Sequence, residues 1–530
     1  MLIDGYFPMH DDTQPARVFA LSQELKRGIF PVRLVSLLGY GYGYPIFNFY
    51  APLPYYLGAL LYLSGLDLII AAKMMFIIGS LLAGIFMYIL VQSQAGPAVA
   101  IASSLFYLYA PYHAVNMYVR GAVGEYYAYA FLPLLFFGIA GIFKKGFKFL
   151  FAGALGLAAI ILSHNILGLI TVYFLFLTLV ILLILFFYKK ISVRVLISFI
   201  IIILLGISLS SFFILPAVFE KDYTLVNSLT AGGSNYRNHF VSIVQLWDSP
   251  WGFGGSVSGL MDGLSFKIGK FHILASLLAL FLLQKRQFYF SLTVFVIFLL
   301  SVFMMTEESS FIYSLLPYFN FIQYPWRFLN FVVFSIPLLL ISLNNIQNRL
   351  IKTLLIFFLA SAVVLINHKY FSVQYIYPLT ENDYLSSREL QFKISGISDE
   401  YLPPDLVPPK IENEIAKDLI QGEKVKLAIL ENETRYKSLN FFVDREVQVK
   451  TNIAFFPGWQ ASVDNKKIPI DKEDGFVTVN LPAGRHKLEF NFKNTPVRTV
   501  SNTISFLSLI LILYLAIVPA KKWQKKSRSR

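Results

Sequence analysis

The chain has 530 residues, of which 56% are hydrophobic and only 14% are charged. Soluble globular proteins contain about 45–50% apolar and about 25% charged residues, so this composition indicates a polytopic α-helical membrane protein. The absence of cysteine excludes disulfides, zinc–thiolate sites and iron–sulfur clusters. The net charge of +14 is not accompanied by a nucleic-acid-binding motif, so we expect membrane lipid and no nucleic acid as a partner.

Residues 1–66 precede the first long apolar stretch, and we expect them to form a first outer loop. Within this loop, residues 14–28 and 52–65 predict two helices that lie along the membrane surface. The first is amphipathic, and the second is apolar but short for a span. Met1 is expected outside without a signal peptide to export it, which predicts a further transmembrane helix upstream of this sequence.

Residues 67–367 are expected to form a transmembrane core with outer loops at 217–267 and 306–327. Windows of about 19 residues indicate eleven apolar spans, or twelve with the upstream helix. The first ten are expected near residues 68–92, 97–118, 122–143, 148–163, 166–188, 195–216, 268–284, 288–305, 328–344 and 351–367. Residues 499–530 predict the last transmembrane helix, near 499–519, and a basic tail.

Basic residues mark one side of this core. The short connections at 144–148, 189–194, 285–286 and 349–352 and the C-terminal tail carry only Lys and Arg as charged residues. They fall on one side if the spans alternate, and such loops face the cytoplasm. We therefore expect a multi-pass protein of the cell membrane with a cytoplasmic C-terminus and a working face that is extracytoplasmic.

Residues 368–498 are polar, and from Leu439 onward apolar and polar residues alternate between turn pairs. This pattern predicts antiparallel strands in a small extracytoplasmic β-sandwich. Tyr401 and Trp459 are candidates for exposed aromatic residues that pack against a glycan. The alternative is a structural lid with Trp459 in its core.

His10, Asp11 and Asp12 come directly before the first amphipathic segment. Capping of that helix by Asp12 or Thr13 would explain them. The alternative is a carboxylate that acts as general base on an acceptor hydroxyl, with a divalent cation, Mg²⁺ or Mn²⁺, held by Asp11 and Asp12 beside a phosphate. The residues by themselves leave both explanations open.

Further polar groups lie at the predicted outer ends of the spans. Glu125 begins an apolar stretch, where an ionisable residue suggests a functional role. Arg120 and Arg327 either extend to the membrane surface or bind a phosphate, and Tyr324 belongs either to an aromatic belt or to the same site. The remaining candidates for ligand contact at these outer ends are His113, His164 and Asn165.

Six segments, in order along the chain, carry a resemblance to a known family. They are YFPMHDD (6–12), GYGYGYPIFNFYAPLPYYLG (39–58), RGAVGEYYAYAFLPL (120–134), SHN (163–165), QYPWRFL (323–329) and FFPGW (455–459). Together they resemble the bacterial and archaeal membrane proteins described as 6-pyruvoyl-tetrahydropterin synthase-related, which are similar to GT-C class glycosyltransferases.

The resemblance implies a GT-C-like helical core and an inverting transfer of a hexosyl or pentosyl group. The donor would be a polyprenyl-phosphate sugar, and the acceptor a hydroxyl of a glycan, lipid or protein. Asp11 or Asp12 would match the catalytic acid residue of the first outer loop, and Glu125 the second acidic site. Arg327, with Arg120, would stabilise the departing phosphate. The other substrate-binding candidates are His10, His113, His164, Asn165 and Tyr324.

The alternative function is non-enzymatic: a lipid or glycan transporter, or a scaffold for cell-envelope polysaccharide. A transporter should carry polar or broken-helix sites near the middle of the bilayer. The predicted spans at 166–188, 195–216 and 288–305 contain no charged residue, which disfavours an ion pathway. The sequence therefore favours the enzyme.

Overall fold

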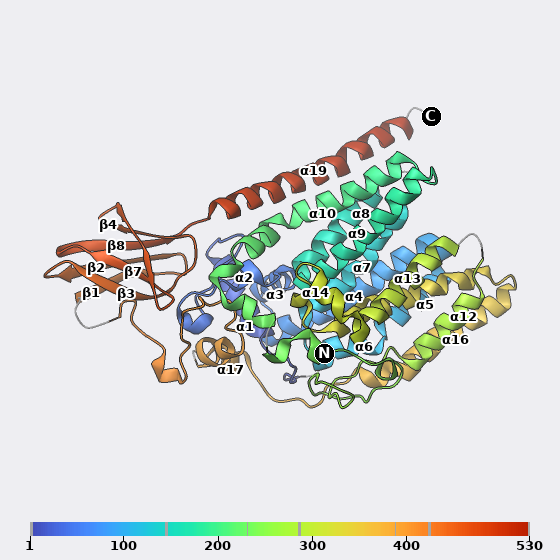
Figure 1. Ribbon diagram of the computed structural model, residues 1–530, viewed down its shortest axis with the longest axis horizontal. Coiled ribbons are helices and arrows are strands. Elements are labelled where there is room, and N and C mark those ends of the chain that lie inside the picture. Colours follow the sequence, from blue (N-terminus) through green and yellow to red (C-terminus); the bar gives the residue numbers. More distant parts are fainter. Residues whose placement is uncertain are drawn as a thin grey trace.

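The computed structural model describes residues 4–143, 147–230, 232–284, 288–386, 388–421 and 426–527. The helices form an elongated bundle, and the β-rich region lies beyond one end of it, at the left of Figure 1. Helix α19 (Pro496–Ser527) leaves the β-rich region and runs along the bundle toward the C-terminus. The architecture is therefore a helical membrane core with one β-rich attachment.

The first 66 residues contain three helices, α1 (Gln14–Lys26), α2 (Ile46–Phe49) and α3 (Leu53–Leu63). The position of the first amphipathic segment relative to the membrane stays a prediction, but its polar side chains Arg17, Ser22 and Glu24 on α1 are buried in protein. Burial of polar groups is tolerated when neighbours supply partners. Here Glu24 pairs with Arg27 at 2.8 Å and accepts a hydrogen bond from Thr434 of the β-rich region at 2.6 Å.

Seven helices in the described part of the chain are long and apolar enough to cross a membrane, or nine if two bent pairs each count as one span. They include α4 (Leu68–Ala95), α7 (Val123–Gly141), α9 (Asn165–Phe187), α10 (Val193–Phe219) and α16 (Arg349–Asn367), together with a span at Pro325–Asn345 that contains α15 (Leu329–Leu339) and the membrane part of α19, Pro496–Tyr514. The polytopic helical class is confirmed, whereas the expected count of eleven is not.

Breaks and short helices account for the difference in span number. Helix α5 (Pro97–Leu108) ends before Pro111, which has no amide hydrogen to continue the ladder, and the chain turns by 51° into Pro111–Val119. Helix α13 (Phe288–Met305) is followed by Glu307–Leu315 at 91°. Two further apolar helices, α8 (Phe147–Ser163) and α12 (Lys270–Phe281), are shorter than the ~20 residues that a span requires.

Four short α-helices lie in the loops between the long ones in the described part of the chain. Two of them are α11 (Ile243–Trp247) and α14 (Ser310–Leu315), and the other two are α17 (Glu381–Leu385) and α18 (Ser395–Ile397). A fifth short α-helix, α6 (Pro111–Ala114), begins the bent segment after α5. Helices α7 and α8 pack closely because Gly138 lies against Gly153, where an added Cβ would come within 2.3 Å of backbone. The span at Pro325–Asn345 is buried over its entire apolar window.

As far as the structure describes it, the β-rich region contains eight strands in two antiparallel sheets, of order β1-β2-β8-β4-β5 and β3-β7-β6. The strands are β1 (Lys426–Asn432), β2 (Tyr436–Val443), β3 (Val447–Ala454), β4 (Trp459–Val463), β5 (Lys466–Ile468), β6 (Asp471–Glu473), β7 (Phe476–Leu481) and β8 (Gly484–Phe492). Leu439 and Leu488 of one sheet and Val477 and Val479 of the other belong to one buried cluster. The predicted antiparallel strands are confirmed.

Asp474 and Gly475 form one of the turn pairs between the predicted strands. Both residues have positive φ, 49° and 79°, which is the backbone of the tight turn that joins β6 to β7. A second turn of this kind, at Asp464 and Asn465 between β4 and β5, has φ of 46° and 66°. The sequence does not reveal this turn readily, because its second residue is Asn465 and not the glycine that is usual at that position.

The aromatic candidates for glycan contact are not on the surface. Trp459 is 8% exposed and packs against Phe492 with ring centres 5.3 Å apart. Tyr401 is 6% exposed and stacks on Phe49 of α2 at 5.5 Å. The expectation of exposed rings is therefore wrong, and the alternative with Trp459 in the core is confirmed. Long-range packing, which the local alternation of polar residues does not reveal, decides both positions.

A buried ion pair joins α10 to α19. Glu220, directly after α10, accepts a hydrogen bond from Nε of Arg498 at 3.0 Å and one from Asn48 of α2 at 2.9 Å. Thr495 donates to the other carboxylate oxygen at 2.7 Å. Arg498 has no exposed surface. The junction between the bundle and the β-rich region therefore depends on paired buried charges.

Replacing Arg498 with Leu should leave the Glu220 carboxylate buried without its cation. Loss of one partner of a buried pair costs about 3–5 kcal/mol in the free energy of unfolding. Thermal unfolding of the detergent-purified protein measures this loss, and the exposed Arg485→Leu serves as the control. The double variant Glu220→Leu with Arg498→Leu should be more stable than the sum of the single changes predicts. Equal stability of Arg498→Leu and the unchanged protein would contradict the assignment.

Candidate functional site

Several segments that are far apart in the sequence meet at one end of the bundle. Because α7, α8 and α9 follow one another with alternating direction, the start of α7 and the junction of α8 with α9 lie at the same end. The loop before α1 is tied there by backbone hydrogen bonds, from the amide of His10 to the Val119 carbonyl at 3.0 Å and from that of Asp11 to the Arg120 carbonyl at 2.9 Å. The first loop is therefore fixed beside the start of α7.

These segments enclose a cavity of about 390 Å³. Seven of the residues that the sequence singled out line it, namely His10, Asp11, Arg120, Glu125, His164, Tyr324 and Arg327. Tyr50, Ser256 and Trp326 line it as well. The cavity is thus the place where most of the predicted polar residues come together.

Glu125 is the most deeply buried charge of this cavity, with no exposed surface. One carboxylate oxygen lies 2.8 Å from a guanidinium nitrogen of Arg120 and 3.6 Å from Nε of Arg327. The other accepts hydrogen bonds from Tyr112 and Asn330, each at 2.7 Å. A buried carboxylate is stable only when it is paired in this way. One carboxylate between two guanidinium groups leaves a net positive charge beside the cavity.

Aromatic rings hold the two guanidinium groups from their other sides. Arg120 lies over the ring of Trp326 at 4.4 Å, and Arg327 lies over the ring of Tyr324 at 5.0 Å. The two rings stack on each other with centres 5.0 Å apart. Planar guanidinium groups that are fixed in orientation suit the recognition of phosphate oxygens. This side of the cavity is therefore suited to an anionic group.

Asp11 brings a carboxylate to the same cavity. It accepts hydrogen bonds from Thr13 at 2.7 Å, Gln14 at 3.0 Å and Tyr50 at 3.2 Å, and it pairs with Arg17 at 3.2 Å. Its side chain is 28% exposed, whereas that of Arg17 is 5% exposed. The carboxylate is thus held in one orientation while a face of it stays accessible.

Capping does not explain the two aspartates. Thr13 is the residue before α1, but its hydroxyl donates to Asp11 and caps no backbone amide. Asp12 accepts hydrogen bonds from the hydroxyls of Tyr384 at 2.8 Å and Tyr377 at 3.0 Å and does not line the cavity. The capping explanation is therefore wrong, and only Asp11 of the adjacent pair faces the site.

His164 adds a neutral hydrogen-bond donor. Burial and the nearby Arg327 lower the pKa of His164 to about 3. Its Nδ1 accepts a hydrogen bond from the backbone amide of Leu167 at 3.1 Å, so the ring proton is on Nε2. The imidazole can therefore donate to a ligand oxygen in the cavity.

Three of the other candidates have different surroundings. His113 lines a separate cavity. Asn165 is exposed and donates to the Phe49 carbonyl at 2.7 Å, which fixes α2. His10 lines the site but is exposed, and its Nε2 donates to the Phe253 carbonyl at 2.9 Å. The structure therefore does not place His113 or Asn165 with the other predicted residues.

Sequence reasoning missed the neutral groups that hold the charges. Asn330 lies three residues after Arg327, one helical turn away, and its amide bonds both Glu125 and the Arg327 carbonyl. That spacing could have revealed it. Tyr112 and Tyr50 carry no comparable signal, because tyrosine is frequent along the whole chain.

Metal binding stays a prediction. Within the described residues, no group of three or more His, Asp or Glu side chains that could hold a metal ion was found. Asp11 and Asp12 turn to different partners, so they do not offer two carboxylates to one Mg²⁺ or Mn²⁺. Of these two aspartates, only Asp11 could be a ligand of a cation in this cavity.

Asp12 should give the stability of the protein a pH dependence. Burial raises the pKa of Asp12 to about 6, against the hydrogen bonds from Tyr384 and Tyr377, which lower it. The unfolded chain then holds fewer protons than the folded protein between about pH 4 and pH 6, so the contribution of Asp12 to stability falls as pH rises through this window.

Asp12→Asn should remove this component. The melting temperature of the unchanged protein should fall relative to that of the variant from about pH 4 to pH 6, with the exposed Asp474→Asn as control. Parallel curves for Asp12→Asn and the unchanged protein would refute the assignment.

No curated protein and no solved structure matches the chain. A family model does match: residues 47–376 fit the 6-pyruvoyl-tetrahydropterin synthase related domain, which is a membrane protein family. The matched stretch contains Arg120, Glu125, His164 and Arg327, and Asp11 precedes it. Because it covers more than half of the sequence, the chain belongs to the family of membrane proteins with the 6-pyruvoyl-tetrahydropterin synthase related domain.

Proposed function

We propose that this protein is a GT-C-like glycosyltransferase of the cell membrane, of the EC 2.4 type. It would transfer a hexosyl or pentosyl group from a polyprenyl-phosphate donor to the hydroxyl of a glycan, lipid or protein acceptor. The observation that carries the proposal is that a partly exposed carboxylate and two fixed guanidinium groups line one cavity. Sugar transfer from a phosphate needs a base for the acceptor and positive charge for the leaving group.

In this reaction Asp11 takes the proton of the acceptor hydroxyl. The hydroxyl oxygen attacks the anomeric carbon, the bond from that carbon to the phosphate oxygen breaks, and the configuration inverts. The phosphate leaves with the electron pair, and Arg327 and Arg120 stabilise its added charge. Nε2 of His164 donates a hydrogen bond to an oxygen of the bound substrate. Arg17, paired with Asp11 at 3.2 Å, holds the carboxylate in place.

The distribution of basic connections supports an extracytoplasmic site. The cavity is at the end of the bundle where α7 and α9 begin, and the basic connection 189–194 follows α9 at its other end. Short basic connections face the cytoplasm. The proposal therefore places the cavity and the β-rich region outside the cell and the C-terminal tail inside.

One experiment separates the enzyme from the alternative. The purified protein is incubated with polyprenyl-phosphate sugars and a hydroxyl acceptor, and mass spectrometry detects released polyprenyl phosphate and the new glycoside. The same lipids are offered to the protein in sealed vesicles. Movement of labelled lipid or glycan across the vesicle membrane without a new glycoside would favour a transporter. The absence of both movement and a new glycoside would favour a scaffold.

Asp11→Asn tests the base. Asn keeps the shape and most hydrogen bonds but cannot take a proton, so turnover should fall by about 10²–10⁴-fold. Donor affinity should stay within a few-fold of the unchanged protein. Asp12→Asn is the matched control, since it makes the same change one residue away and outside the cavity. A folded Asp11→Asn variant with full activity would exclude this mechanism.

Arg327→Ala tests the phosphate site. A phosphate is anionic before the reaction and gains charge as it departs, so both donor binding and turnover should weaken. We expect a loss of about 10²–10³-fold in turnover, by analogy with removal of one donor to a developing anion. Arg237→Ala, at an exposed arginine, is the control. Unchanged donor affinity in a folded Arg327→Ala variant would place the phosphate elsewhere.

A further inference from the structure

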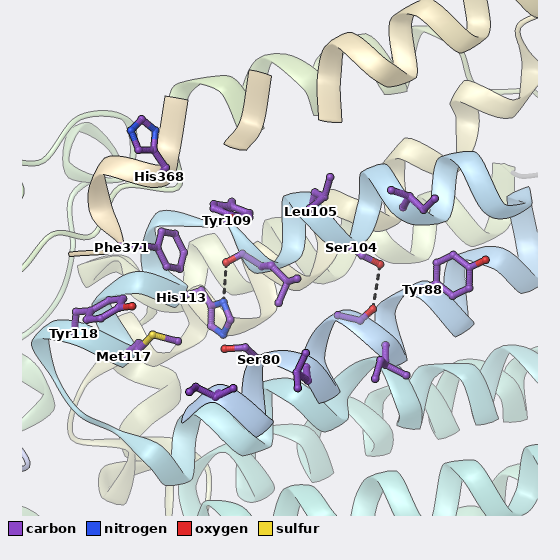
Figure 2. Close-up of a pocket in the computed structure, with 16 residues that line it drawn as sticks. Ser80, Tyr88, Ser104, Leu105, Tyr109, His113, Met117, Tyr118, His368 and Phe371 are labelled. Atoms are coloured by element: carbon purple, nitrogen blue, oxygen red, sulfur yellow. Dashed lines mark hydrogen bonds between the residues drawn. The ribbon is translucent and has the colours of Figure 1, made fainter. Parts of the chain in front are cut away.

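A second cavity, of about 930 Å³, opens on the side of the bundle between α4 and α5 (Figure 2). Aliphatic and aromatic side chains form most of its lining, and the residues after α16 cover one end. Leu81, Ile85 and Ile101 at its edge are 59%, 51% and 53% exposed, on helices of a membrane bundle. The cavity is therefore accessible from the lipid phase, and its volume lies within the ~300–1,000 Å³ that is usual for ligand sites.

Apart from the histidines His113 and His368, the described lining carries no basic or acidic side chain. Of the described residues that border this cavity, none is Lys, Arg, Asp or Glu. A phosphate or an ammonium group would lose its hydration there without gaining a counter-ion, which is unfavourable. The chemistry of the lining therefore selects a neutral occupant.

His113 supplies one unused hydrogen-bond acceptor. Its Nδ1 donates to the Leu108 carbonyl at 2.8 Å, where α5 breaks, so its Nε2 carries a lone pair and no proton. His113 is 2% exposed, and its Nε2 has no hydrogen-bond partner. Stacking on Tyr126, with ring centres 4.4 Å apart, fixes the imidazole. A buried acceptor of this kind calls for a donor from a ligand.

The hydroxyl of Ser80 does not fill this role. Ser80 lines the same cavity, but its hydroxyl donates to the Phe76 carbonyl at 2.9 Å and takes a hydrogen bond from Tyr126 at 2.5 Å. With that one hydrogen already used, Ser80 leaves Nε2 of His113 free for a group that enters from the membrane.

We propose that this cavity binds a neutral membrane lipid whose polar end carries a free hydroxyl, of the diacylglycerol class. The hydroxyl would donate to Nε2 of His113, and an acyl chain would lie between α4 and α5. This site is separate from the cavity around Glu125. Tyr112 donates a hydrogen bond to Glu125, whereas the adjacent His113 lines the second cavity. The inference does not depend on the proposed transfer reaction.

Photolabelling tests this site without any measurement of activity. The full-length protein in phosphatidylcholine nanodiscs is irradiated with a diacylglycerol that carries a diazirine in one acyl chain, and labelled peptides are mapped by mass spectrometry. Labels should map to α4 and α5. An analogue with the same chains but an O-methyl group in place of the hydroxyl should label about tenfold less, because it leaves Nε2 unpaired. A phosphatidic acid probe should also label less.

Two matched variants locate the label. Ile85→Trp fills the cavity from its lipid-facing edge and should reduce labelling by about tenfold, whereas Ile197→Trp makes the same change at an equally exposed position of α10 outside the cavity. His113→Phe keeps the ring and should abolish the preference for the hydroxyl probe. If His113→Phe does not fold, two comparisons still test the proposal. They are Ile85→Trp against Ile197→Trp, and the hydroxyl probe against the O-methyl probe in the unchanged protein. Equal labelling by all three probes, or labelling that Ile85→Trp leaves unchanged, would overturn the proposal.

Discussion

The packing of the bundle end that carries the candidate site depends on the ion pairs that neutralise Glu125. This carboxylate is inaccessible to solvent and lies between Arg120, from the turn before α7, and Arg327, from the segment before α15. Unpaired, any of the three charges would be costly in this apolar setting. The bundle therefore closes only when both segments meet at Glu125. This arrangement also fixes the first loop, because the backbone amide of Asp11 donates a hydrogen bond to the carbonyl of Arg120.

The sequence revealed the charged part of this site more readily than its supports. Glu125 is a sequence candidate because an ionisable residue at the start of an apolar stretch suggests a function, and Arg120 and Arg327 are candidates because a guanidinium group can bind a phosphate. Asn330 is neutral and lies inside an apolar stretch, so its residue type does not mark it as a candidate. The division of roles between Asp11 and Asp12 was equally hidden, since it is set by tyrosines that follow hundreds of residues later.

The fold was predicted unevenly for a related reason. Alternating residues and turn pairs identified the antiparallel strands, because these signals are local. The expected number of spans is not confirmed, because a hydropathy window averages across the break at Pro111 and across helices such as α12 that are apolar but short. The burial of Tyr401 and Trp459 depends on partners such as Phe49 and Phe492, which no local pattern identifies.

The enclosed span at Pro325–Asn345 has a consequence for biogenesis. Its apolar window is entirely buried, whereas that of α9 is 22% buried. Helix α15 packs against α5, α12 and α13, all of which are synthesised before it, while α16 follows it. The early helices must therefore leave room for α15 until it has been inserted, and α16 packs on α5 and completes this side afterwards. The order of synthesis is thus also an order of assembly, in which the innermost helix arrives late.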